Sequence, residues 1–188
     1  MNERSLPSHA LQTFFVSRET SNCPLISEMI TIGRKLDEIG LANDETGIVS
    51  FDYGKRLLIN AKNIDIKKMT QHDVVEIVDY NPLKNNMMVI GTKEPCLETP
   101  VHWIIQKARH DFNVLLQINS TRLFEKYKGT LPTTEIETPP MTLDRAKELL
   151  KTLRAGKTIL IKNEGILFGA INIKEMQNAV LTCLEGEK

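Results

Sequence analysis

The sequence has few cysteines, no excess of charge of either sign and no long apolar run. Its three cysteines, Cys23, Cys96 and Cys183, are scattered and odd in number, which is typical of reduced thiols and not of a disulfide framework or a zinc knuckle. The formal net charge is zero, which argues against a nucleic-acid partner or an acidic membrane surface. No stretch approaches the roughly 18 apolar residues of a membrane span, and no charged-then-apolar leader opens the chain. We therefore expect a cytoplasmic protein with no membrane or nucleic-acid partner.

The length and the apolar patterns predict one α/β domain over residues 1–188. Residues 1–23 are expected to form an N-terminal arm or an edge strand. Apolar periodicity predicts helices, and short apolar runs between turns predict strands. The expected helices are 24–39, 99–110, 123–127, 142–154 and 174–184, and the expected strands are 47–51, 56–60, 74–80, 87–91, 114–118, 158–162 and 166–171. This order predicts a central mixed or antiparallel sheet that is covered by helices on both faces.

One stretch in the middle of the chain combines a helix start with a polar strand end. Thr99 and Pro100 predict a helix start, with the threonine side chain as the cap. The strand that follows ends in Gln117 and Asn119, which point the same way because one apolar residue separates them. Polar side chains at a strand end beside a carboxylate, here Glu98, are typical of ligand sites in open sheets.

Six short runs have an order and a spacing that a known family shares. They are Gly47-Ile48-Val49-Ser50, Lys62-Asn63, Met69-Thr70-Gln71-His72-Asp73-Val74-Val75, Glu98-Thr99-Pro100-Val101-His102, Gln117-Ile118-Asn119 and Asn163-Glu164-Gly165. Because of these runs and their order, the chain from Pro24 to Leu184 resembles the class II aldolase/adducin family, which includes fuculose-phosphate aldolase. The resemblance implies a single-domain class II aldolase-like fold.

The resemblance also implies a metal site whose usual ligands are missing. Three histidines in the family hold a zinc ion that polarises the substrate carbonyl. The matching positions here are Gln117, Asn119 and Glu164. The family's catalytic acid/base glutamate matches Glu98. We therefore expect no zinc and no other cofactor. Because these side chains offer oxygen donors, magnesium or manganese is the alternative.

Four further residues are pocket candidates through the resemblance. His102 matches a histidine in the family's helix motif, and Ser50 lies in the strand motif. Lys62 and Asn63 match the turn that binds substrate phosphate in the family, while Ile48 replaces an asparagine that also contacts phosphate. A lysine in this turn suggests a small anionic or sugar-phosphate ligand.

The same residues also have plainer interpretations. Glu98 fits a carboxylate that is stabilised at a helix start, and His102 fits a structural hydrogen bond. Gln117 and Asn119 can bond to neighbouring backbone, and Glu164 can be an exposed turn residue. If the family's geometry holds, the carboxylates of Glu98 and Glu164 lie close together and repel each other. A shared proton or a basic group, such as Lys62 or Arg122, would relieve the repulsion.

Two functions are consistent with these patterns. The first is a non-catalytic or functionally diverged binding protein on the class II aldolase fold. The alternative is a sugar-phosphate aldolase-like lyase or isomerase that uses a divalent metal other than zinc, or no metal. If the protein is active, it is expected to be a carbon–carbon lyase with Glu98 as its catalytic residue. The resemblance further implies a homo-oligomer, specifically a tetramer.

Overall fold

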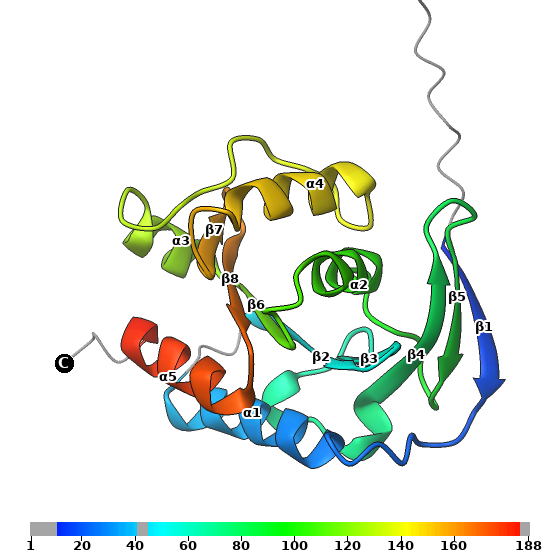
Figure 1. The fold of residues 1–188 in the computed structure, drawn as a ribbon. Helices are drawn as coiled ribbons and strands as arrows, with labels where there is room; N and C mark the ends of the chain where they lie inside the picture. Colours follow the sequence, from blue (N-terminus) through cyan, green and yellow to red (C-terminus); the bar gives the residue numbers. More distant parts are fainter. Residues whose placement is uncertain (1–10, 41–44, 185–188) are drawn as a thin grey trace, which may run out of the picture.

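One mixed sheet runs through the computed structural model, which describes residues 11–40 and 45–184 (Figure 1). Its strands are β1 (Gln12–Ser17), β2 (Thr46–Tyr53), β3 (Arg56–Asn60), β4 (Val74–Asn81), β5 (Asn86–Ile90), β6 (Val114–Asn119), β7 (Thr158–Ile161) and β8 (Gly165–Ala170). Their spatial order is β1-β5-β4-β3-β2-β6-β8-β7. Strand β1 pairs in parallel with β5, and the other neighbours are antiparallel. The predicted mixed sheet is therefore confirmed, and β1 is one of its edges.

Helices cover both faces of this sheet. They are α1 (Ile26–Glu38), α2 (Thr99–Ala108), α3 (Thr121–Tyr127), α4 (Leu143–Thr152) and α5 (Ile173–Leu184), with the short 3₁₀ helices η1 (Ile66–Lys68) and η2 (Gln71–Asp73). Helices α1 and α5 lie on one face, and α2 and α4 lie on the other (Figure 1). The predicted cover on both faces is thus confirmed. None of the described helices has the length and apolar character needed to cross a membrane.

Strand β6 shows how the sequence separates the two faces. Leu116 and Ile118 belong to the core beneath α1 and α5, whereas Leu115 packs with α2 and α4. Because successive strand residues point to opposite faces, Gln117 lies on the same side as Leu115. The polar end of β6 is therefore placed beneath α2 and α4.

The starts of α2 and α4 differ from each other in how they are capped. Thr142 caps α4 as predicted, and its Oγ1 accepts a hydrogen bond from the Arg145 amide at 3.1 Å. The predicted Thr99 cap is wrong, because Glu98 occupies the cap position of α2. Thr99 is already helical, and its hydroxyl donates back to the carbonyl oxygen of Cys96 at 2.7 Å.

Gly165 brings the turn before β8 close to β6. A Cβ atom at this position would lie 2.0 Å from the carbonyl oxygen of Ile118, so a larger residue would push the two strands apart. Gly165 pairs with Asn119 across the sheet. The Ser120 amide also donates to the carbonyl oxygen of Glu164 at 2.8 Å. These contacts hold Glu164 beside the polar end of β6.

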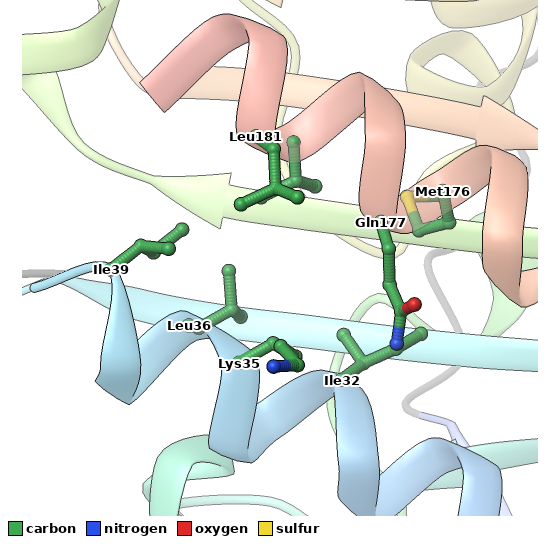
Figure 2. Close-up of a pocket in the computed structure, with 8 residues that line it drawn as sticks. Ile32, Lys35, Leu36, Ile39, Met176, Gln177 and Leu181 are labelled. Carbon is green, nitrogen blue, oxygen red and sulfur yellow. The ribbon is translucent and has the colours of Figure 1, made fainter. Parts of the chain in front are cut away.

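A small apolar groove lies between α1 and α5, on the other side of the sheet from the polar end of β6. Figure 2 shows Ile32 and Leu36 from α1 facing Met176 and Leu181 from α5. The groove encloses only about 20 Å³. Its position and its apolar lining separate it from the polar residues that the sequence marks as a candidate site.

Candidate functional site

A hollow of about 280 Å³ lies at the polar end of β6. Glu98, Asn119 and Glu164 line it, and Lys62 and Asn63 line it from the turn after β3. The structure thus brings together residues that are widely separated in the sequence. A second hollow, of about 410 Å³, shares Glu164 as a wall and extends toward α4. The two hollows together are called the cleft below.

Two of the carboxylates that line the cleft, those of Glu98 and Glu164, are joined by a buried arginine from α4. Arg145 Nε donates to Glu98 at 3.0 Å. Its Nη1 and Nη2 donate to the two oxygens of Glu164 at 2.9 and 2.6 Å. Nη1 also donates to the carbonyl oxygen of Thr138 at 3.1 Å. With only 1% of its side chain exposed, Arg145 is the basic group that relieves the repulsion between the carboxylates.

Burial gives the Glu98 carboxyl group an unusually high pKa. Only 4% of the residue is exposed, and burial raises its pKa to about 7. The positive charge of Arg145 works against this rise, whereas the negative charge of Glu164 adds to it. Glu98 therefore gains or loses a proton near neutral pH. This is a suitable property for an acid/base residue, and burial is the largest cause of the shift.

The amide of Gln117 turns its nitrogen toward the other two positions that the family resemblance marks. Its Nε2 donates to Asn119 Oδ1 at 2.8 Å and to Glu164 Oε1 at 3.3 Å. Asn119 Nδ2 in turn donates to Thr46 Oγ1 at 3.3 Å. Gln117 and Asn119 therefore bond to side chains and not to neighbouring backbone. The three positions converge, and they are already connected by hydrogen bonds.

Ser50 and His102 lie beneath the cleft floor and do not line the cleft. Both are fully buried, and Ser50 Oγ is 2.8 Å from His102 Nδ1 and 3.0 Å from Gln106 Oε1. Gln106 Nε2 donates to the carbonyl oxygen of Asn113, which orients its oxygen toward Ser50. The serine hydroxyl must therefore donate to Gln106, and the hydrogen between Ser50 and His102 sits on Nδ1.

The hydrogen-bond chain beneath the cleft leaves two atoms without a partner. Among the described residues, His102 Nε2 and Gln117 Oε1 have no hydrogen-bond partner although both are buried. Burial lowers the pKa of His102 to about 3; its contact with Gln117 opposes this shift, and the charge of Arg145 adds to it. The imidazole is thus neutral, and both atoms are enclosed beneath the cleft.

The remaining candidates lie at exposed positions. Lys62 and Asn63 are exposed, and Asn63 has a left-handed backbone with φ of 57°. In the described part of the chain, neither side chain has a hydrogen-bond partner. Arg122, the other basic group considered from the sequence, pairs with Glu45 at 3.3 Å. Neither Lys62 nor Arg122 reaches the Glu98 carboxylate.

The residues present do not fit the zinc ion that the family resemblance implies. At the three ligand positions, Gln117 presents an N–H donor to its neighbours, and both oxygens of Glu164 accept from Arg145. Zinc in proteins prefers nitrogen and sulfur ligands. Within residues 11–40 and 45–184, no group of three or more His, Cys, Asp or Glu side chains is arranged to hold a metal ion.

Comparisons with known proteins agree with the resemblance. A sequence model of the Class II Aldolase and Adducin N-terminal domain matches residues 27–185. Among solved structures, an L-fuculose 1-phosphate aldolase superposes with a TM-score of 0.69 at 21% identity, covering 88% of this chain and 85% of its own. A sugar-phosphate aldolase from Thermotoga maritima superposes with a TM-score of 0.66 at 14% identity, covering 85% of this chain and 90% of its own. The L-fuculose-1-phosphate aldolase from Thermus thermophilus superposes with a TM-score of 0.65 at 15% identity, covering 86% of this chain and 89% of its own. No curated protein matches by sequence. At these identities, the structural matches show the fold alone.

Proposed function

Because the chain belongs to the class II aldolase and adducin N-terminal domain family, we propose that it is a binding protein that has kept the aldolase fold without aldolase activity. Its cleft binds a small anionic ligand and does not cleave it. The observation that carries this proposal is the chemistry of the family's three ligand positions, where Gln117 bonds to Asn119 and Glu164, and Glu164 is paired with Arg145.

Aldol cleavage develops negative charge on the substrate carbonyl oxygen, and that charge must be stabilised by a cation or by hydrogen-bond donors. None of the side chains at the family's three ligand positions is a histidine, and they bond to one another and to Arg145. Arg145 is the buried cation nearest to Glu98, and its hydrogen bonds already go to Glu98, Glu164 and Thr138. A general base alone supplies only about 10²- to 10⁴-fold, so a Glu98 carboxylate without an electrophile would leave most of the barrier in place.

The ligand class follows from the exposed side of the cleft. Lys62 offers a positive charge, and Asn63 beside it offers an amide, on a turn that lines the smaller hollow. Ile48 and Leu97 give the same hollow apolar walls. Such a surface suits a small anion that carries an apolar or weakly polar part. A sugar phosphate, the class of compound for which the similar aldolases are named, is the first ligand to test.

The pKa of Glu98 supports a second candidate function. A carboxyl group with a pKa of about 7 can accept a proton at neutral pH and return it, as acid/base catalysis requires. On this basis the chain would be a lyase or isomerase that uses Glu98 with magnesium, manganese or no metal. The lack of histidines at the three ligand positions, together with the hydrogen bonds that already occupy Arg145, makes this the weaker of the two proposals.

One pair of assays separates the candidates. The full-length protein is incubated with L-fuculose 1-phosphate, with zinc, magnesium, manganese or a chelator, and products are followed by mass spectrometry. Binding of the same compound and of inorganic phosphate is measured by calorimetry. We expect binding without cleavage, and we expect Lys62→Ala to weaken binding by about tenfold, because an ion pair to the ligand is lost.

Lys68→Ala is the matched control, since this exposed lysine lies outside the hollow and its loss should leave the affinity unchanged. Cleavage at ordinary enzyme rates, lost in Glu98→Gln, would overturn the binding proposal in favour of the second candidate. Equal effects of the two lysine substitutions would show that the ligand does not bind at the Lys62 turn.

A further inference from the structure

The side chains of Glu98 and Glu164 lie close together in the cleft, where water only partly screens their charges. Glu98 has 5% of its side chain exposed and Glu164 has 33%. Like charges that are partly removed from water repel each other and require a compensating cation. That cation is supplied by the chain itself, through a fully buried arginine on α4.

The guanidinium group of Arg145 is held from three directions. It contacts Glu98 at the start of α2, both oxygens of Glu164 in the turn before β8, and the carbonyl oxygen of Thr138 in the segment before α4. The paired contacts to Glu164 match the planar fork of a guanidinium group. The group therefore has one defined place, between the glutamate at the family's acid/base position and one of the family's three ligand positions.

We propose that Arg145 is a tethered cation that takes the place of a divalent metal ion and keeps such ions out of the cleft. A metal would have to coordinate the same carboxylate oxygens to which the guanidinium group already donates. It would also sit against a buried positive charge that cannot leave without losing its partners. This inference rests on the proposed function, because both assign the cleft a chemistry without a metal, but it concerns metal binding and not turnover.

Removing the positive charge should reverse this exclusion. Arg145→Met leaves Glu98 and Glu164 facing each other with the side chain of Asn119 nearby, a set of oxygen donors that suits manganese. Arg145→Lys keeps the charge and should continue to exclude the ion. Arg122→Met removes the arginine that pairs with Glu45, and serves as the control for losing any arginine near the cleft.

The experiment measures Mn²⁺ affinity by calorimetry and by electron paramagnetic resonance. We expect Arg145→Met to bind one Mn²⁺ on the order of tenfold or more tightly than the wild type, Arg145→Lys or Arg122→Met. Adding Glu164→Gln to Arg145→Met should remove the gain, because a ligand is lost. Wild-type affinity equal to that of Arg145→Met, or a gain that survives Glu164→Gln, would overturn the proposal.

A second measurement covers the case in which Arg145→Met does not fold. In the wild-type protein, millimolar Mn²⁺ should not selectively broaden the amide signals of residues 117–119 and 163–165. Selective broadening there would show that the ion enters beside Arg145, which contradicts the proposal. Cleavage of a sugar phosphate that resists chelators would instead overturn the proposed function and leave the exclusion of metal intact.

Discussion

Replacing Glu98 by glutamine should change how the stability of this protein depends on pH. The folded-state pKa of Glu98 is about 7, against an ordinary value of 4.5. Between these values the folded protein holds a proton that the unfolded chain has released. The contribution of Glu98 is therefore fully present below pH 4.5, and it is lost as the pH rises to 7. The slope is about −1.4 kcal/mol per pH unit, which sums to about 3 kcal/mol over this window.

The pKa shift of His102 changes the pH dependence of stability in the opposite direction. Its folded-state pKa is about 3, against an ordinary value of 6.5. Between these values the unfolded chain holds a proton that the folded protein does not, so stability rises with pH by about 1.4 kcal/mol per unit. In the overlap, from pH 4.5 to 6.5, the two slopes cancel in the wild type.

Replacing either Glu98 or His102 should therefore reveal the pH dependence of stability that the other residue causes. Glu98→Gln leaves the His102 slope, and its free energy of unfolding should rise by about 3 kcal/mol from pH 4.5 to 6.5 relative to the wild type. His102→Asn leaves the Glu98 slope, and its free energy of unfolding should fall by a similar amount. A constant cost of either substitution does not affect this comparison, because only the slopes are compared.

The measurement is urea unfolding, followed by circular dichroism at half-unit steps from pH 4.5 to 8. Glu125→Gln is the control, because this glutamate is exposed on α3 with 64% of its side chain accessible, and its curve should run parallel to the wild type. A Glu98→Gln curve parallel to the wild type between pH 5 and 6.5 would refute the raised pKa of Glu98, and with it the description of this carboxyl group as a neutral-pH acid.

Two further predictions concern the ion pairs and the assembly. Arg145→Met should lower the free energy of unfolding by about 3–5 kcal/mol, since it leaves a buried carboxylate without a partner. Arg122→Met should cost at most about 1 kcal/mol, because Arg122 is half exposed and Glu45 keeps its hydrogen bond from Ser120. Equal losses in urea unfolding would show that Arg145 is not the central cation. Light scattering at micromolar concentration should give a homo-oligomer, specifically a tetramer; a monomeric mass would contradict this.

Much of the fold could be predicted because its signals are local. Alternation along β6, the Thr142 cap and the turn at Gly165 each act through near neighbours, and each appears in the structure. The parallel pairing of β1 with β5 could not be predicted, because it joins Phe14 to Met88 across most of the first half of the chain. Local patterns identify a strand but do not identify its partner.

The candidate site was predictable in position and less so in contacts. Period-two alternation places Gln117 and Asn119 on one face of β6, and the structure confirms this. Ser50 was grouped with the cleft through the family motif. On β2 it faces α2 and bonds to His102 and Gln106 beneath the floor. A motif fixes where a residue lies along the chain, whereas packing of the helix above decides which space its side chain meets.

Arg145 was missed, although the sequence carries a signal for it. It precedes Leu149 by four residues, so both lie on one face of α4, and Leu149 belongs to the apolar core. An arginine on an inward face requires a buried negative partner, because an unpaired buried charge is costly. The sequence can therefore predict that such a partner exists. It could not identify the partners, since Glu98 and Glu164 lie 47 and 19 residues away and only the fold brings them to the same side chain.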